Sequence, residues 1–273
     1  MQELLRADNV LRKMLGWPSR QGAVAQPWVV KEEAASHEVH LRFRVYSEIP
    51  VVGAKLALED AEVAKIVVNG QTVTEKPDGW FVDKCIGTVA LPQLNPGETV
   101  IEVTLPFGRR TNVEWCYLLG DFGVDICGSR RTIVSKSKQI GFDDITRQRM
   151  PHYTGNIAYQ VPVVTNGGKL RVTVPHYSGA MVRVDLDGKP AGHILYPPYV
   201  LEIGNVEAGQ HQLDFVLLNT RENAFGPLHY ADTKRDRSAP DKWRSQAYFW
   251  SDSYRLVPAG IRTVPVVEEI TEK

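Results

Sequence analysis

Hydrophobic and polar residues alternate along most of this chain, with the period of a half-buried β-strand. From His40 to Tyr46, polar side chains at every second position alternate with Leu41, Phe43 and Val45. Similar short runs, bounded by Gly, Pro or Asn, continue almost to the C-terminus. This pattern predicts antiparallel strands and leaves little room for helices.

One helix is predicted at the start of the chain. Leu4, Leu11 and Leu15 recur at near-helical spacing, and a glycine at position 16 with a proline at position 18 follows as a stop signal. Residues 17–36 are rich in Pro, Gly, Ala and Gln without a period. They are expected to form an extended connector.

The strand pattern of the first half recurs in the second half. Two of the recurring elements are predicted hairpins closed by Asn69-Gly70 and Asp187-Gly188, the side chains that best tolerate a type I′ turn. The corresponding segments are 38–48 and 156–164, 53–58 and 168–174, 65–70 and 182–188, 80–91 and 193–203, 96–103 and 208–215, and 118–124 and 255–261. Two copies of about 110 residues predict an all-β fold of two tandem jelly-roll β-sandwiches with a short N-terminal helix.

The repeat sets the expected domain boundaries. Residues 1–36 form the N-terminal helix and connector, 37–135 the first β-sandwich, 136–265 the second β-sandwich, and 266–273 a C-terminal tail.

Composition narrows the classes of function. The chain has 273 residues, of which 43% are hydrophobic and 23% charged, so it can build a core. Lys plus Arg and Asp plus Glu both number 32, and this balance argues against a nucleic-acid partner, which requires a basic face. No apolar run approaches the roughly 18 residues of a membrane-spanning helix, so no membrane partner is expected.

The cysteines and the N-terminus bear on the compartment. Cys85, Cys116 and Cys127 are odd in number and lack CxxC spacing, so they are interpreted as buried thiols and not as a disulfide framework or zinc site. The first residues do not resemble a signal peptide. We therefore expect a cytoplasmic location, unless the chain is a fragment of a secreted protein.

The repeated unit resembles the galactose-binding-like sandwich, the sugar-binding jelly roll that accompanies the catalytic barrel in glycoside hydrolase family two and its relatives. Residues 112–124, 151–157 and 221–229 are similar to strings in the C-terminal region of large bacterial glycosyl hydrolases. The likeness spans nearly all of residues 1–261. In that family an upstream barrel carries the reaction, and this sequence has no such βα alternation. The resemblance implies a non-catalytic carbohydrate-binding region, with carbohydrate and an upstream catalytic domain as its partners.

Sugar binding requires an aromatic platform for the apolar face of the ring and a few fixed polar groups for the hydroxyls. The segment 221–253 is a long connection in which polar residues surround a Phe-Gly-Pro turn. The alternative is that these groups tie the loop to its own sandwich or to a catalytic barrel. The candidate carbohydrate-binding residues are Arg221, Asn223, His229, His176, Tyr177, Tyr153 and Trp243.

Three further residues are secondary candidates. For Trp80 and Trp115, packing in the core or between domains is the preferred interpretation. For Asp121, the preferred interpretation is a turn carboxylate that bonds nearby backbone N–H groups.

A glycosidase acting alone needs two carboxyl groups roughly 5 to 10 Å apart. The pairs considered are Asp121 with Asp125, and Asp143 with Asp144, which in a turn would act as caps. Glu222, Asp232 and Asp236 share the long loop. No catalytic residue is assigned, and an autonomous hydrolase is ranked last, behind a structural docking module that packs on a barrel or partner subunit.

Metal chemistry has no signature here. The histidines at positions 152, 176, 193 and 229 are scattered without ligand spacing. No metal site and no cofactor are expected, although a structural calcium ion stays open as an alternative.

Overall fold

The computed structural model describes residues 4–19, 33–111, 113–231 and 249–270. Strands dominate, and the helical elements are α1 (Leu4–Met14), η2 (Ile145–Arg147) and α2 (Glu222–Phe225). The all-β prediction with a short N-terminal helix is confirmed. None of the described helices is long and apolar enough to span a membrane.

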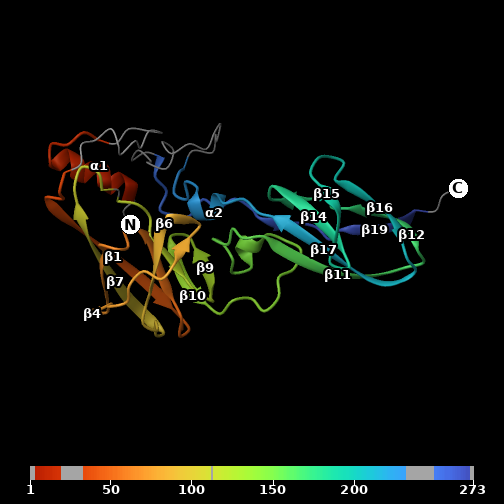
Figure 1. Cartoon of the computed structure of the whole chain (residues 1–273), viewed down its shortest axis with the longest axis horizontal. Helices are drawn as coiled ribbons and strands as arrows, with labels where there is room; N and C mark the ends of the chain where they lie inside the picture. The colour runs from red at the N-terminus through yellow and green to blue at the C-terminus, as the bar shows by residue number, and fades with distance from the viewer. Residues whose placement is uncertain (1–3, 20–32, 112, 232–248, 271–273) are drawn as a thin grey trace. The chain divides into compact units, whose positions relative to one another are not determined.

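The chain divides into two compact units (Figure 1). Unit 1 contains residues 1–136 and 229–255, and unit 2 contains residues 137–228 and 256–273. Residues 229–255, which were expected inside the second sandwich, therefore group with unit 1. This segment therefore interrupts unit 2 in sequence.

Unit 1 is built from two β-sheets. The six-stranded sheet has the order β4 (Gln71–Thr72), β3 (Lys65–Val68), β7 (Gly97–Phe107), β1 (His37–Ser47), β10 (Arg130–Val134) and β9 (Gly123–Cys127). The four-stranded sheet has the order β5 (Trp80–Phe81), β6 (Asp83–Ala90), β2 (Lys55–Glu59) and β8 (Tyr117–Leu119). Neighbouring strands are antiparallel, except that β1 and β10 pair in parallel at Ser47 and Ile133.

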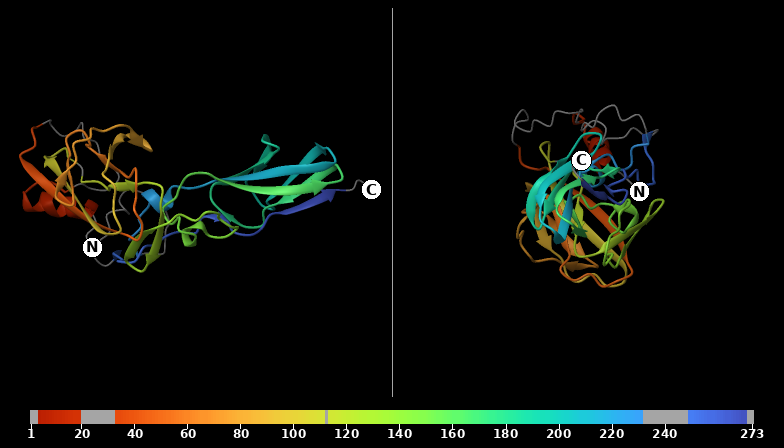
Figure 2. Two further views of the ribbon diagram at one scale, coloured as in Figure 1. Left: turned by 90° about the horizontal axis from the view of Figure 1, so that it is seen from below. Right: turned by 90° about the vertical axis from the view of Figure 1, so that its right-hand side faces the viewer.

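Unit 2 is also built from two main sheets. The four-stranded sheet has the order β11 (Ile157–Thr165), β17 (Gly209–Leu218), β14 (Met181–Leu186) and β15 (Lys189–Ile194). The second sheet has the order β16 (Val200–Val206), β12 (Gly168–Thr173) and β19 (Val266–Ile270), and a short pair joins β13 (Tyr177–Ser178) to β18 (Gly260–Ile261). Strands β11 and β17 run alongside each other in Figures 1 and 2.

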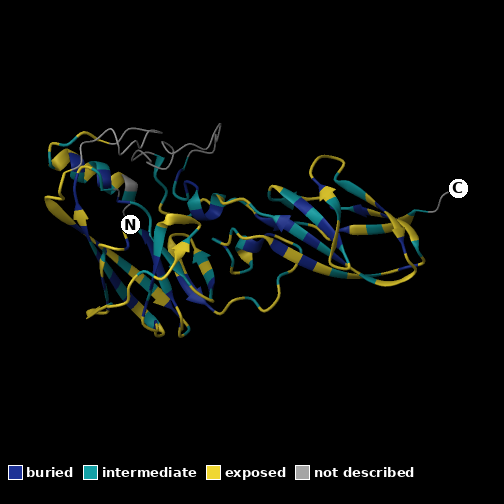
Figure 3. Cartoon of the chain, in the orientation of Figure 1, coloured by how far each residue is buried: buried dark blue, intermediate teal, exposed yellow. Residues whose placement is uncertain are grey.

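The period-2 pattern produces the cores. Along β17, Leu213, Phe215 and Leu217 are fully buried while the residues between them are partly exposed. Figure 3 shows this alternation along the strands. One face of β17 thus enters a core and the other is more exposed, as the alternation predicts.

The strand pairing repeats between the two units. In unit 1, β7 lies between β1 and β3, and in unit 2, β17 lies between β11 and β14. The hairpin turns also match: Asn69 and Asp187 have φ angles of 49° and 50°. In both turns the side-chain Oδ1 accepts a hydrogen bond from a backbone N–H of the neighbouring strand, from Val100 at 2.8 Å and from Gln212 at 2.9 Å. The two units thus share this strand order and this turn geometry.

One predicted correspondence is wrong. Residues 118–124 were matched with 255–261, but β8 pairs with β2 in the same way as β19 pairs with β12. The counterpart of β8 is therefore β19, in the segment expected to be a tail. Short apolar runs beside a glycine align readily in sequence, and only the pairing partner distinguishes them.

The prediction of buried thiols is wrong for two of the three cysteines. Cys85 and Cys127 are exposed near the ends of β6 and β9, and Cys116 is half-buried. Burial raises the pKa of Cys116 to about 12. At Cys85, partial burial and the hydrogen bond with Asp83 raise the pKa to about 11.

A charged contact at the Asp187 turn makes unit 2 sensitive to pH. Nδ1 of His211 lies 2.6 Å from Oδ2 of Asp187, and this hydrogen bond raises the pKa of His211 above 6.5. Two hydrogen bonds lower the pKa of Asp187 below 3.8: the larger effect comes from the backbone N–H of Gln212, and the smaller one comes from the His211 side chain. His211 therefore contributes fully to the stability of unit 2 at pH values below its pKa in the unfolded state. This contribution is lost as the pH rises through its pKa in the folded state. The Asp187 contribution is present above its unfolded pKa and is lost as pH falls through its folded pKa.

We expect His211→Gln to lower the melting temperature more at pH 5.5 than at pH 8.5, because more of the imidazole is protonated at the lower pH. Scanning calorimetry at the two pH values measures the difference. His193→Gln, an exposed histidine on β15, is the matched control and should show no such pH-dependent loss. An equal loss for His211→Gln at both pH values would contradict the prediction.

Candidate functional site

One row of residues aligns all four strands of the four-stranded sheet in unit 2. Ile157 pairs with Leu217, Leu217 pairs with Val182, and Val182 pairs with Ile194. All four side chains are buried. Because the row fixes the register, the connections just beyond it leave the sheet at the same end. We call this end, with residues 153–156, 176–180, 195–199 and 219–221, the loop end.

The loop end gathers four of the predicted binding residues. Tyr153, which precedes β11, exposes 43% of its surface, and its hydroxyl donates to the carbonyl oxygen of Asn156 at 3.3 Å. Exposed Arg221 follows β17 at the start of α2, and exposed His176 with half-buried Tyr177 precedes β14. Four residues from three connections are thus brought to one edge of the sheet.

The most exposed ring at the loop end is one that sequence reasoning missed. Tyr196, in the connection between β15 and β16, exposes 76% of its surface. The Tyr177 hydroxyl donates to the carbonyl oxygens of Ile194 and Leu195, at 3.3 Å each, and so holds the start of this connection. The available signal was a Tyr-Pro-Pro-Tyr string between two predicted strands.

The end of the same connection is fixed by Tyr199. Its ring meets that of Tyr177 edge to face, with 5.4 Å between centroids. Its backbone N–H donates to Tyr196, and its carbonyl accepts from Val174, both at 3.0 Å. Tyr199 has a φ angle of 60°, which is unusual for a bulky side chain and persists only where the surroundings enforce it. The exposed Tyr196 is therefore carried on a connection anchored at both ends.

Asn223 does not face a ligand. It is buried, and its side-chain amide pairs with the backbone of Val257: Nδ2 donates to the carbonyl at 2.8 Å, and Oδ1 accepts from the N–H at 2.9 Å. His152 donates from Nδ1 to the Asn223 carbonyl at 2.9 Å. Asn223 thus ties α2 to the segment that returns to unit 2.

His229 belongs to unit 1, whereas Arg221 belongs to unit 2, because the division between the units falls between residues 228 and 229. Its ring stacks on Trp250 and contacts Tyr254, with centroids 4.6 and 4.5 Å away. Its Nδ1 donates to the carbonyl of Ser251 at 2.8 Å, and burial lowers the pKa of the ring. His229 anchors the stem of the 229–255 excursion, where Tyr230 and Trp250 form an antiparallel bridge.

Trp80, Trp115 and Asp121 lie in unit 1. Trp80 exposes 57% of its surface, so the interpretation of this ring as core is wrong. Trp115 is half-buried, and the exposed carboxylate of Asp121 binds Nζ of Lys136 at 2.6 and 2.8 Å. Trp243 lies outside the described residues.

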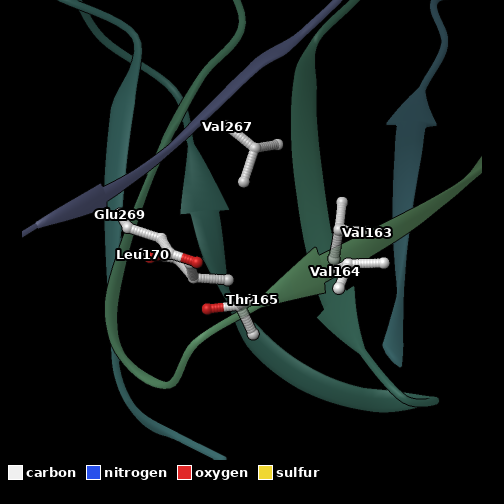
Figure 4. Close-up of a pocket in the computed structure, with 6 residues that line it drawn as sticks. All are labelled: Val163, Val164, Thr165, Leu170, Val267 and Glu269. Atoms are coloured by element: carbon white, nitrogen blue, oxygen red, sulfur yellow. The ribbon is translucent and has the colours of Figure 1, made fainter. Parts of the chain in front are cut away.

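Two other features of the described residues bear on where a ligand could bind. Within the described ranges, no three His, Cys, Asp or Glu side chains gather in a way that could hold a metal ion. A pocket of about 200 Å³ lies at the opposite end of β11, lined by Val163, Val164, Thr165, Leu170, Val267 and Glu269 (Figure 4). It has no aromatic wall, and Glu269 is already bonded to the backbone N–H of Asn166 at 2.7 Å.

Comparison with known proteins finds a likeness among solved structures. No family model matches the chain, and no curated protein matches it. Among solved structures, a rhamnosidase from Novosphingobium sp. PP1Y is 18% identical, with a TM-score of 0.35. The match covers 94% of this chain and 26% of the rhamnosidase, so this chain spans about a quarter of that enzyme's length.

Proposed function

We propose that this chain is a non-catalytic carbohydrate-binding region of a glycoside hydrolase, and that the loop end of unit 2 holds the saccharide. The observation that carries the proposal is the ring of Tyr196, exposed on a connection that hydrogen bonds fix at both ends. In this proposal the bond-breaking step belongs to a separate catalytic domain.

The chemistry of the loop end suits a saccharide. A pyranose ring has one face of C–H groups, which packs on an aromatic ring, and a rim of hydroxyls, which needs hydrogen-bond partners. Tyr196 offers the ring, and exposed Arg221 and His176 offer donors at the same end of the sheet. Because the connection is already ordered, less conformational entropy is lost when a sugar binds.

Three of the carboxylates named as possible catalytic groups have other partners. Asp121 binds Lys136, and Asp143 lies 3.5 Å from Nε of Arg262. Oδ1 of Asp144 accepts from the Thr146 N–H at 3.0 Å, as the cap predicted from sequence. Carboxylates used in this way support the assignment of a binding role and not of hydrolysis.

Replacing Tyr196 with alanine tests the proposal. We expect wild-type protein to bind at least one member of a panel of plant, host and bacterial polysaccharides, and Tyr196→Ala to bind about tenfold more weakly, equivalent to ~1.4 kcal/mol. Affinity electrophoresis identifies the polysaccharide, and isothermal titration gives the affinity.

Val164→Ala is the matched control. Val164 is exposed to the same extent as Tyr196, 76%, but lies at the opposite end of β11. This variant should bind like the wild type. Flat responses of the wild type across the panel, or equal binding by Tyr196→Ala, would rule out the proposed site.

A further inference from the structure

The repeat places an exposed ring at the same connection in both units. In unit 2, Tyr196 lies between β15 and β16. In unit 1, the corresponding connection runs from β4 to β6 and contains β5, which begins with Trp80. Trp80 and Tyr196 are both large exposed hydrophobic side chains, at 57% and 76%. Each lies just before the strand that pairs with the equivalent central strand, β6 with β2 and β16 with β12.

The two connections share backbone features besides the ring. Val82, just before β6, has a φ angle of 66°, and Tyr199, just before β16, has one of 60°. In each unit, a ring close in sequence to the exposed one packs on another ring. The ring centroids of Phe81 and Tyr117 are 5.3 Å apart, and those of Tyr199 and Tyr177 are 5.4 Å apart. Both connections therefore expose one ring while a neighbouring ring anchors the backbone.

The connection in unit 1 also carries an ordered polar group. Asp78, two residues before Trp80, accepts from Nζ of Lys55 at 2.7 Å and from Oγ1 of Thr88 at 3.0 Å. The backbone is fixed at this point, because the Asp78 N–H donates to Thr88 at 2.9 Å and the Thr88 N–H donates to Gly79 at 3.0 Å. The side-chain hydrogen bonds from Lys55, first, and from Thr88 lower the pKa of Asp78, so Asp78 is a carboxylate at neutral pH. The connection thus combines an aromatic face with charged groups suited to hydroxyls.

We propose that Trp80 is the platform of a second saccharide site, in unit 1, so that one chain binds two sugar segments. This inference rests on the proposed function of unit 2 and extends it by symmetry. A long polysaccharide engaged at both sites would bind more tightly than a short oligosaccharide engaged at one, without any new contact.

Tryptophan fluorescence separates the two sites. The described tryptophans, at positions 17, 80, 115 and 250, all lie in unit 1. Binding at Trp80 should change the emission directly, and the part of the change that Trp80→Ala removes is assigned to this ring. Titration calorimetry counts both sites. The probes are hexasaccharides of β-linked glucose, galactose, mannose and xylose, together with rhamnogalacturonan fragments of similar length.

Three variants define the expected result. Wild-type protein should bind two hexasaccharides per chain with a fluorescence change. Tyr196→Ala should bind one hexasaccharide per chain and keep the fluorescence change. Trp80→Ala should also bind one hexasaccharide but lose the fluorescence change. Trp80→Phe, which keeps a ring, should still bind two but lose the fluorescence change. Because Trp80 is exposed, its variants should melt like the wild type, and a melting curve for each confirms this.

The outcomes distinguish the two proposals. If wild-type protein binds one hexasaccharide and Trp80→Ala leaves the affinity unchanged while Tyr196→Ala removes it, the second site is wrong and the function proposed for unit 2 stands. If only Trp80→Ala removes binding, the site proposed in unit 2 is wrong. If wild-type protein binds no probe by calorimetry or fluorescence, both fail.

Discussion

Replacing Arg12 with methionine is expected to lower the free energy of unfolding of unit 1 by about 3–5 kcal/mol. Arg12, on α1, is buried, and its Nε lies 3.0 Å from Oδ1 of buried Asp8. Its two terminal nitrogens donate to the carbonyl oxygens of Arg109 and Thr111, at 3.0 and 2.6 Å. Removing the guanidinium takes the charge partner from a buried carboxylate and leaves two carbonyls without these donors, which is the costly way to break a buried ion pair.

The same substitution should detach α1 from unit 1. The guanidinium lies 5.7 Å from the Phe107 ring, on which Trp17 also stacks at 5.5 Å between centroids. Urea denaturation followed by tryptophan emission therefore reports the change, and the melting temperature should fall by on the order of 10 °C. Lys13→Met, at the exposed neighbouring position, should leave both values near those of the wild type. Unchanged stability for Arg12→Met would mean that α1 does not contribute to the unit 1 core.

Asn223→Ala should destabilise unit 2 by about 2–4 kcal/mol, because it removes the two hydrogen bonds that the buried Asn223 amide makes with the backbone of half-buried Val257. With 3% of its surface exposed, Asn223 pairs with the N–H and the carbonyl of Val257, 34 residues away. Asn223→Asp should be no better, because a carboxylate cannot donate to the Val257 carbonyl and introduces a buried charge.

Hydrogen exchange locates this effect. The Val257 amide should exchange faster in Asn223→Ala than in wild-type protein, and unfolding followed by far-UV circular dichroism should shift to lower urea concentration. Arg221→Ala, two residues earlier and exposed, is the control for stability and should shift neither. If the Val257 amide stays protected in Asn223→Ala, the paired amide is not what holds the returning chain.

His229 and Asn223 show what the sequence could not reveal about the predicted site residues. Sequence reasoning grouped them with Arg221 because all three surround one turn. The partners that decide their roles, Trp250 and Val257, come more than 20 residues later. A polar side chain near a turn looks the same in sequence whether it faces a ligand or satisfies a distant backbone group.

Tyr153, His176, Tyr177 and Arg221 were predicted as candidates individually, and their common position could not be. Residues as far apart as Tyr153 and Arg221 meet at one end only because strand order and register align Ile157, Leu217, Val182 and Ile194. The same alignment brings in Tyr196, whose Tyr-Pro-Pro-Tyr string does not by itself indicate a binding site.

The sequence by itself determined the strands, the Asn-Gly and Asp-Gly turns, the N-terminal helix and the twofold repeat. These follow from side-chain alternation and from backbone preferences that act over a few residues. The tertiary structure decided which unit the 229–255 excursion joins, which strand is the counterpart of β8, and which rings are exposed. Those features depend on strand pairing and burial between segments that are distant in sequence. The pattern of residues within a short segment does not determine the free energy of such contacts.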